Sequence, residues 1–207
     1  MTENLIQNLQ TIFESSSSVF ALLGIFLLIV FLIYLRRIKF STKILMNISL
    51  MIALSIILHQ IPIYHFPQGG YITFGSMIPL ILLSFRYGFA VGMLAGFIFG
   101  LMDIILDPFI LHPIQVLFDY PLPFMAAGLA AIFKNFFAST ILVFVGKFIC
   151  HFISGVIFFA SYAPEGISPV IYSLTVNASM IIPECLICCV LLKILPIERL
   201  LNAMDKN

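Results

Sequence analysis

Long apolar stretches dominate this sequence and restrict what it can fold into. A helix that crosses a bilayer needs roughly 20 mostly apolar residues. The chain is 62% hydrophobic and only 9% charged, a balance that no single soluble core of this size needs. The sequence therefore predicts an all-α integral membrane protein. We place about seven spans, separated by short polar or Pro/Gly-marked breaks, at residues 19–35, 44–64, 71–85, 87–107, 113–133, 136–160 and 168–192.

The basic residues predict how these spans are oriented. An alternating path places nine of the ten Lys and Arg residues on one side, which is cytoplasmic by the positive-inside rule. The predicted outer segments contain none; they are residues 1–18, 65–70, 108–112 and 161–167. We therefore expect a multi-pass protein of the cell membrane with its N-terminus outside and its C-terminus in the cytoplasm.

Composition and motifs also argue against several classes of function. The net charge is +1 and the basic residues are scattered, so we expect no nucleic-acid partner. All four cysteines lie within apolar spans, and no His pair converges with them, so we expect neither a disulfide framework, a metal site nor a cofactor. The hydrolase and metalloprotease signatures are missing, as is a nucleotide-binding loop, because Phe148 follows Gly146 and Lys147.

Polar residues inside the spans point to a binding site. An ionisable side chain at mid-bilayer costs about 2.5 to 3.5 kcal/mol, so each should face a partner, a cavity or a ligand. The predicted topology brings most of them to the outer half of the membrane, as expected for a pocket open to the outside. The set is Asp103, Gln115, Asp119, Lys147, His151, Tyr172, Asn177 and Glu184.

The sequence also indicates which of these residues lie near one another. Gln115 and Asp119 are four residues apart and share a helical face. Lys147 is interpreted as a structural partner of Asp119 or Glu184, not as a ligand contact. A carboxylate, an amide, an imidazole and aromatic rings together suit a flat, aromatic, partly cationic molecule.

Four stretches form an ordered set of motifs: Pro-Gln-Gly-Gly at 67–70, residues 77–88 with Met-Ile-Pro-Leu and Ser-Phe-Arg-Tyr-Gly, His-Pro-Ile-Gln-Val-Leu-Phe-Asp-Tyr at 112–120, and residues 151–177. Through these motifs the chain, from about residue 44 to 195, resembles the thiamine-specific S-component of energy-coupling factor (ECF) importers. The resemblance implies a six-helix bundle that captures thiamine near its outer surface. It also implies docking on a transmembrane T-component that carries two ATP-binding subunits.

The resemblance assigns roles to particular residues. It implies that Asp119 is the acidic pocket residue, that His151, Tyr172 and Asn177 contact the pyrimidine, and that Phe159 stacks on it. Tyr120 lies beside the acid. Possible further contacts are Gln68, Gly69, Gln115 and Phe109, although some relatives have tyrosine in place of Phe109. Ser49 and Ala53 match a small-xxx-small docking face on the first bundle helix.

The N-terminal span is a departure from the six-helix pattern. We expect residues 1–40 to form an extra transmembrane anchor with a basic cytoplasmic linker, and residues 41–207 to form the substrate-binding membrane domain. Two other functions remain open. One is a self-sufficient proton-coupled carrier for a small cationic heterocycle that uses Asp103, Asp119 and Lys147, and the other is a membrane enzyme that uses His151 and Asp119.

Overall fold

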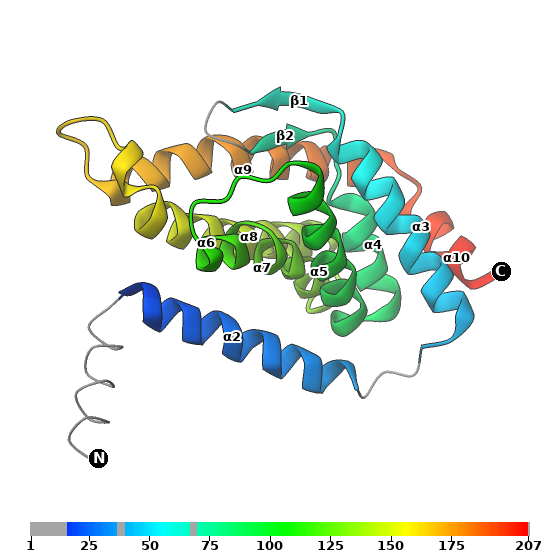
Figure 1. Ribbon diagram of the computed structural model, residues 1–207. Coiled ribbons are helices and arrows are strands. Elements are labelled where there is room, and N and C mark those ends of the chain that lie inside the picture. The colour runs from blue at the N-terminus through cyan, green and yellow to red at the C-terminus, as the bar shows by residue number, and fades with distance from the viewer. Residues whose placement is uncertain (1–15, 37–39, 67–69, 207) are drawn as a thin grey trace, which may run out of the picture.

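The computed structural model describes residues 16–36, 40–66 and 70–206. Helices form most of this part of the chain and pack side by side into a bundle, with one two-stranded sheet across it (Figure 1). The elements are, in order, α2 (Ser16–Leu35), α3 (Thr42–His59), β1 (Pro62–His65), β2 (Tyr71–Thr73), α4 (Ile78–Tyr87), α5 (Phe89–Leu106), α6 (Pro113–Asp119), α7 (Pro121–Met125), the 3₁₀ helix η1 (Ala126–Ala131), α8 (Phe136–Phe158), the 3₁₀ helix η2 (Ala160–Tyr162), α9 (Pro169–Ile194) and α10 (Ile197–Lys206).

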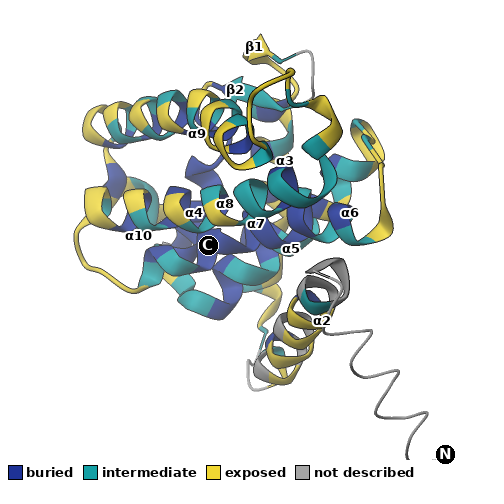
Figure 2. Ribbon diagram, turned by 90° about the vertical axis from the view of Figure 1, so that its left-hand side faces the viewer, coloured by how far each residue is buried: buried dark blue, intermediate teal, exposed yellow. Residues whose placement is uncertain are grey.

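Several helices are suited to a bilayer by length and composition. Within the described residues, five helical runs are long and apolar enough to cross a membrane: Thr42–His59, Phe89–Leu106, Pro113–Ala131, Phe136–Phe158 and Pro169–Ile194. Large apolar side chains such as Leu50 on α3 and Leu186 on α9 are exposed on the outer faces of these helices. Figure 2 shows this pattern, with exposed residues on the outside of the bundle and buried ones between the helices. Such extensive exposed apolar surface is expected where lipid covers a protein.

The predicted span at 71–85 is wrong as a single crossing helix. Its first residues form β2, and α4 has only 10 residues, or about 15 Å at 1.5 Å per residue. The apolar character of α4 comes from burial inside the protein, because Leu80, Ile81 and Leu83 have no exposed surface. The predicted span at 44–64 is also too long, since its helix ends at His59 before Pro62 begins β1. The count of six bundle crossings plus one therefore stays a prediction.

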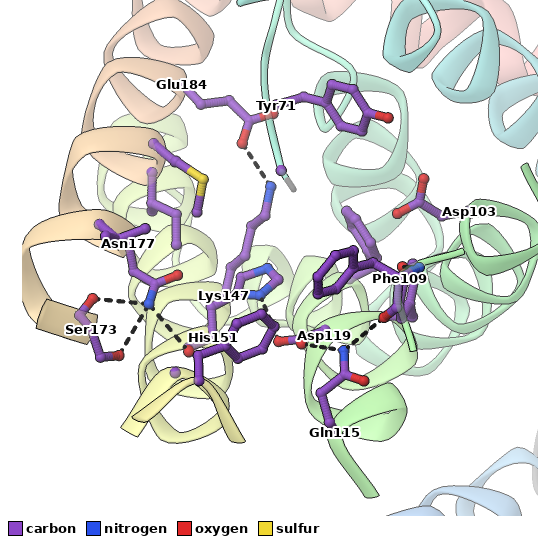
Figure 3. A pocket seen from close by; sticks show the side chains of 18 of the residues that line it. Tyr71, Asp103, Phe109, Gln115, Asp119, Lys147, His151, Ser173, Asn177 and Glu184 are labelled. Carbon is purple, nitrogen blue, oxygen red and sulfur yellow. Dashed lines mark hydrogen bonds and ion pairs between the residues drawn. The ribbon is translucent and has the colours of Figure 1, made fainter. Parts of the chain in front are cut away.

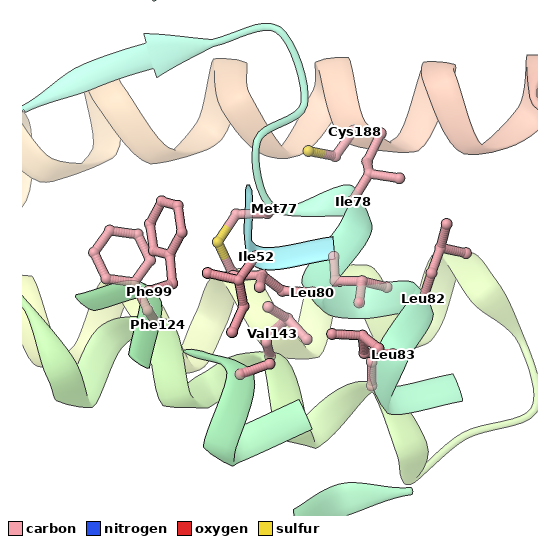
Figure 4. Packing of buried hydrophobic residues seen from close by; sticks show 14 of the residues in the cluster. Ile52, Met77, Ile78, Leu80, Leu82, Leu83, Phe99, Phe124, Val143 and Cys188 are labelled. Atoms are coloured by element: carbon pink, nitrogen blue, oxygen red, sulfur yellow. The ribbon is translucent and has the colours of Figure 1, made fainter. Parts of the chain in front are cut away.

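The main core surrounds α4. Ile52 of α3, Leu80 of α4, Phe99 of α5, Val143 of α8 and Cys188 of α9 converge there from different helices (Figure 4). Inside a bilayer, lipid tails are as apolar as these side chains, so close packing and polar contacts hold helices together instead.

Two glycines on α5 allow that close packing. A Cβ atom at Gly96 would lie 2.0 Å from the backbone oxygen of Phe124, and one at Gly100 would lie 2.5 Å from that of Tyr120. Any larger residue would push the α7 segment away from α5. These glycines therefore fix the positions of Tyr120 and Phe124, which both line the cavity described below.

Helix α2 packs on a second, smaller cluster. Phe31 of α2 is buried with Phe118, Leu122 and Met125, and its ring lies 5.8 Å from that of Phe97. Figure 1 shows α2 on the side of the bundle opposite the β1–β2 hairpin. The described part of the N-terminal segment thus rests against the back of α6 and α5.

The hairpin and the start of α6 follow from local chemistry. Strands β1 and β2 are antiparallel, and His65 pairs with Tyr71. Thr73 Oγ1 donates a hydrogen bond of 2.7 Å to Glu184, which attaches the hairpin to α9. Pro113 is the first residue of α6, and the His112 side chain caps the helix by accepting from the Ile114 N–H.

Candidate functional site

A cavity of about 140 Å³ lies between the hairpin, α3, α5, α6, α8 and α9. The six predicted substrate-binding residues all line it: Asp119, Tyr120, His151, Phe159, Tyr172 and Asn177. Two of the possible contacts, Gln115 and Phe109, line it as well. The other two, Gln68 and Gly69, lie outside the described residues. Ser49 and Ala53 are exposed on α3 and are not part of the cavity lining.

The α6–α8 wall is organised around Asp119. Gln115 Nε2 donates to Asp119 Oδ2 at 2.6 Å, and His151 Nδ1 lies 3.3 Å from Asp119 Oδ1 (Figure 3). Gln115 is almost completely buried and also donates to the backbone oxygen of Phe109. The predicted shared face of Gln115 and Asp119 is therefore confirmed. Both carboxylate oxygens of Asp119 already have a neighbour on this wall.

The α8–α9 wall presents an amide. Asn177 Nδ2 donates to the backbone oxygens of Ser173 and His151, at 2.9 and 3.3 Å. The Ser173 side chain in turn donates to the backbone oxygen of Phe152 at 2.8 Å. All contacts of the Asn177 amide within the described part of the chain use its nitrogen, so its oxygen is available to a ligand.

Aromatic rings line the cavity beside these two walls. The rings of Phe109 and Phe159 are nearly parallel, with an interplanar angle of 16° and centroids 5.8 Å apart. Phe159 also contacts Tyr162, at a centroid distance of 5.6 Å. Flat rings in this arrangement favour a flat aromatic ligand.

Lys147 was predicted to pair with either Asp119 or Glu184, and the structure pairs it with Glu184. Lys147 Nζ lies 2.6 Å from Glu184 Oε2, and both side chains are buried. The ammonium group also lies 5.2 Å from the ring centroid of Phe124. The second oxygen of Glu184 accepts from Thr73. The pair therefore ties α8, α9 and the hairpin together at the cavity.

The remaining wall was largely missed by sequence reasoning. His59 Nε2 lies 3.0 Å from Asp103 Oδ1, yet the two atoms are not aligned for a hydrogen bond. The ring of His59 is enclosed by Tyr71, Phe99 and Phe124. One signal for His59 was available, since it is an ionisable residue inside a predicted span.

Asp107 and Tyr71 complete this wall. The Tyr71 hydroxyl donates to Asp107 Oδ2, and the Tyr120 hydroxyl donates to the backbone oxygen of Asp107 at 2.9 Å. Burial, followed by the hydrogen bond to Asp107, raises the pKa of Tyr71 well above its usual value. The Tyr71 hydroxyl therefore stays protonated and acts as a donor. Its position on a strand, not in a helix, explains why helical spacing gave no signal for it.

This arrangement suits binding better than chemistry at a metal. Among the described residues, no group of three or more His, Cys, Asp or Glu side chains is placed to hold a metal ion. The cavity instead combines carboxylates that have basic neighbours, an amide and nearly parallel aromatic rings, groups that suit a polar aromatic molecule.

Comparisons with known proteins relate the chain to a family. Residues 45–203 match the family model described as thiamine transporter protein. Thiamine transporter ThiT of Bacillus subtilis is 35% identical over 171 residues, which covers 73% of this chain and 88% of that protein. Thiamine transporter ThiT of Lacticaseibacillus paracasei is 33% identical over 123 residues, or 49% of this chain and 61% of that protein.

A solved structure of ThiT from Listeria monocytogenes shares the fold. It superposes with a TM-score of 0.67 at 23% identity, covering 79% of this chain and 95% of that one. Together with the five helices that are long and apolar enough to cross a membrane, these matches identify a multi-pass membrane transport protein, not an enzyme. The chain belongs to the thiamine transporter protein family.

Proposed function

We propose that this protein is the substrate-binding subunit of an ECF-type vitamin importer, and that it captures thiamine from outside the cell in the cavity described above. The observation that carries the proposal is the convergence of Asp119, His151 and Asn177 with parallel aromatic rings in one cavity. The relatives named as thiamine transporters support the choice of ligand.

The proposal assigns each wall a part of the ligand. The Asn177 oxygen accepts from an amino group on the pyrimidine, while His151 and Tyr172 contact its ring nitrogens and edge. Phe159 stacks on a ring of the ligand, and Asp119 contributes negative charge near it. The cavity is smaller than the roughly 300 Å³ of typical small-molecule pockets. We therefore expect it to widen when the two-ring ligand enters.

The proposal also includes partners. A T-component would dock on the α3 face that contains Ser49 and Ala53, where small side chains allow helices to approach closely. Both residues are exposed on α3. Two ATP-binding subunits would supply the energy for transport. Residues 1–40 would act as an additional membrane anchor.

Uptake measurements test this assembly against the proton-coupled carrier. The carrier would use Asp103, Asp119 and Lys147 as a proton relay, and these side chains lie beside His59, His151 and Glu184, respectively. We expect cells that lack a T-component and its ATPases to accumulate no labelled thiamine, and cells that contain them to do so. Uptake in the absence of these partners would contradict the ECF assignment.

Substitution on α3 separates docking from binding. Ala53→Leu should abolish most ATP-dependent uptake, because the added side chain keeps the T-component away, while thiamine affinity stays within about twofold. Leu54→Phe, at the neighbouring exposed position, serves as the matched control and should retain uptake. Equal uptake by the two variants would show that docking uses another surface.

A further inference from the structure

Helix α2 packs on the bundle along one of its faces. Gly24 and Phe31 are buried and Leu35 is half-buried, and their spacing of seven and four residues places them on one side of a helix. Large apolar side chains are exposed on its other faces (Figure 2): Leu22, Leu23, Ile25, Phe26, Ile29, Val30 and Ile33. α2 therefore has a side that faces the protein and a side that suits lipid. The family match covers residues 45–203 and assigns α2 no role.

The protein-facing side of α2 meets the short helix that carries Asp119. A Cβ atom at Gly24 would be in ordinary van der Waals contact, at 3.7 Å each, with three side chains: Leu117 and Phe118 of α6 and Leu122 of α7. Leu117 lies two residues from both Gln115 and Asp119, so it is on the opposite face of α6 from these two cavity residues. α6 therefore lies between α2 and the cavity.

The position of α6 depends on its neighbours, because this helix is too short to be stable by itself. It has seven residues, or about 10 Å, whereas isolated helices shorter than roughly 12 to 15 residues are marginal. On the cavity side, Gln115 and His151 contact the Asp119 carboxylate at 2.6 and 3.3 Å. On the back, α2 is one of the elements that α6 packs against. A displacement of α2 therefore changes the support behind Asp119.

Phe31 fixes α2 at a second point of the same face. Its side chain is only 2% exposed, and its ring centroid lies 5.8 Å from that of Phe97 on α5. It belongs to the same apolar cluster as Phe118 and Leu122. Lipid tails are as apolar as these side chains, so α2 stays on the bundle through close fit, not through the hydrophobic effect. The fit at Gly24 and Phe31 therefore decides where α2 lies.

We propose that α2 is a positioning element for ligand binding: its packing against the back of α6 keeps Asp119 in place at the cavity wall. This inference rests on the proposed function, since the effect of α2 is measured as thiamine affinity. It goes beyond an anchor, because a helix that only attached the chain to the bilayer would leave thiamine affinity unchanged when its protein-facing side is altered.

Two substitutions at Gly24 test the fit directly. Calorimetric titration of the full chain in lipid nanodiscs gives the Kd for thiamine, and thermal unfolding shows that each variant is folded. Gly24→Ala places a Cβ at 3.7 Å from its neighbours and should keep the Kd within about twofold. Gly24→Leu pushes α2 away from α6 and should raise the Kd by roughly three- to tenfold. Ile25→Phe, which enlarges a side chain on the exposed side, is the matched control and should bind as the wild type does.

The second contact point has its own matched pair. Phe31→Ala removes a buried ring and should raise the Kd by roughly threefold or more, whereas Phe26→Ala removes the same ring from a position that is 61% exposed and should have no effect. If Gly24→Leu does not fold, Phe31→Ala takes its place in the comparisons that follow.

A double-mutant cycle separates positioning of Asp119 from a general loss of structure. In the Asp119→Asn background, Gly24→Leu should change the Kd by less than about twofold, because the carboxylate that α2 positions is already gone. In the Asn177→Ala background, on the α8–α9 wall, Gly24→Leu should keep its full effect. A merely structural role of α2 predicts the same factor in both backgrounds.

The outcomes are distinguishable. If Gly24→Leu and Phe31→Ala bind thiamine as the wild type does, or if Gly24→Leu has the same effect in both backgrounds, the positioning role is overturned while thiamine binding by the wild type stands. If the folded wild-type protein binds no thiamine, the proposed function itself fails and this inference falls with it.

Discussion

The two sides of the cavity differ in how their polar groups are organised. On the side formed by α6, α8 and α9, short sequence spacings place Gln115 near Asp119 and Ser173 near Asn177. On the side formed by α3, the hairpin and α5, partners come from distant segments, as with His59 and Asp103. The first side depends on regular helices, and the second on how a short hairpin is folded over them. Local spacing thus sets part of the first side, where Asp119 and His151 also meet across α6 and α8, whereas tertiary packing sets the second side.

The largest effect is expected where the two sides meet, at the Lys147–Glu184 pair. Lys147→Met leaves a buried carboxylate without its cation, and we expect a loss of about 3 to 5 kcal/mol in the free energy of unfolding. Denaturation of the purified protein in detergent measures it. The double variant Lys147→Met with Glu184→Met should recover most of that stability. If the single variant is as stable as the wild type, the pair does not hold the two sides together.

The next effect compares carboxylates on opposite sides. Asp119→Asn should raise the Kd for thiamine roughly tenfold or more, because hydrogen bonds to charged groups contribute about 1.5 to 3 kcal/mol. Asp103→Asn, whose partner His59 is enclosed by aromatic rings, is the matched variant and should have a smaller effect on Kd. Calorimetric titration measures both. A larger loss for Asp103→Asn would reverse the roles assigned to the two sides.

The two sides of the cavity also differ in how well the sequence predicted them. Gln115, Asp119, His151 and Asn177 lie in segments whose long apolar stretches predict membrane-spanning helices, so their convergence was expected. Tyr71 was placed inside a spanning helix, because the apolar run from 71 to 85 gave no sign that its first residues form a strand. The buried helix α4 has the composition of a membrane span, and composition alone does not separate burial in protein from burial in lipid.

The smallest expected effect concerns the packing behind Asn177. A Cβ atom at Gly155 would lie 2.3 Å from Ser173 Oγ, so Gly155→Ala should displace Ser173 and loosen Asn177. We expect a severalfold rise in Kd, equivalent to roughly 1 kcal/mol. Gly146→Ala on the same helix is the control, because its Cβ would meet Leu129 Cδ1 at 2.9 Å and Ala126 Cβ at 3.0 Å and lies away from Asn177.

Adding Ser173→Ala to Gly155→Ala sharpens this comparison. The smaller side chain removes the 2.3 Å contact with Ser173 Oγ and leaves the 2.9 Å contact with its Cβ, so the double variant should bind more tightly than Gly155→Ala alone. If Gly155→Ala, the double variant and the control Gly146→Ala all bind thiamine as the wild type does, the Ser173–Asn177 contact does not organise the α8–α9 wall for the ligand.

Calorimetric titration of the wild-type protein with thiamine tests the central claim most directly. The sequence contains no Trp, so heat is a clearer signal than intrinsic fluorescence. The account predicts saturable binding of one thiamine per chain in the submicromolar range, equivalent to roughly 8 kcal/mol or more of binding free energy. A folded protein that releases no heat with thiamine would contradict the assignment of this cavity as a thiamine site, and the family relationship would then describe the fold alone.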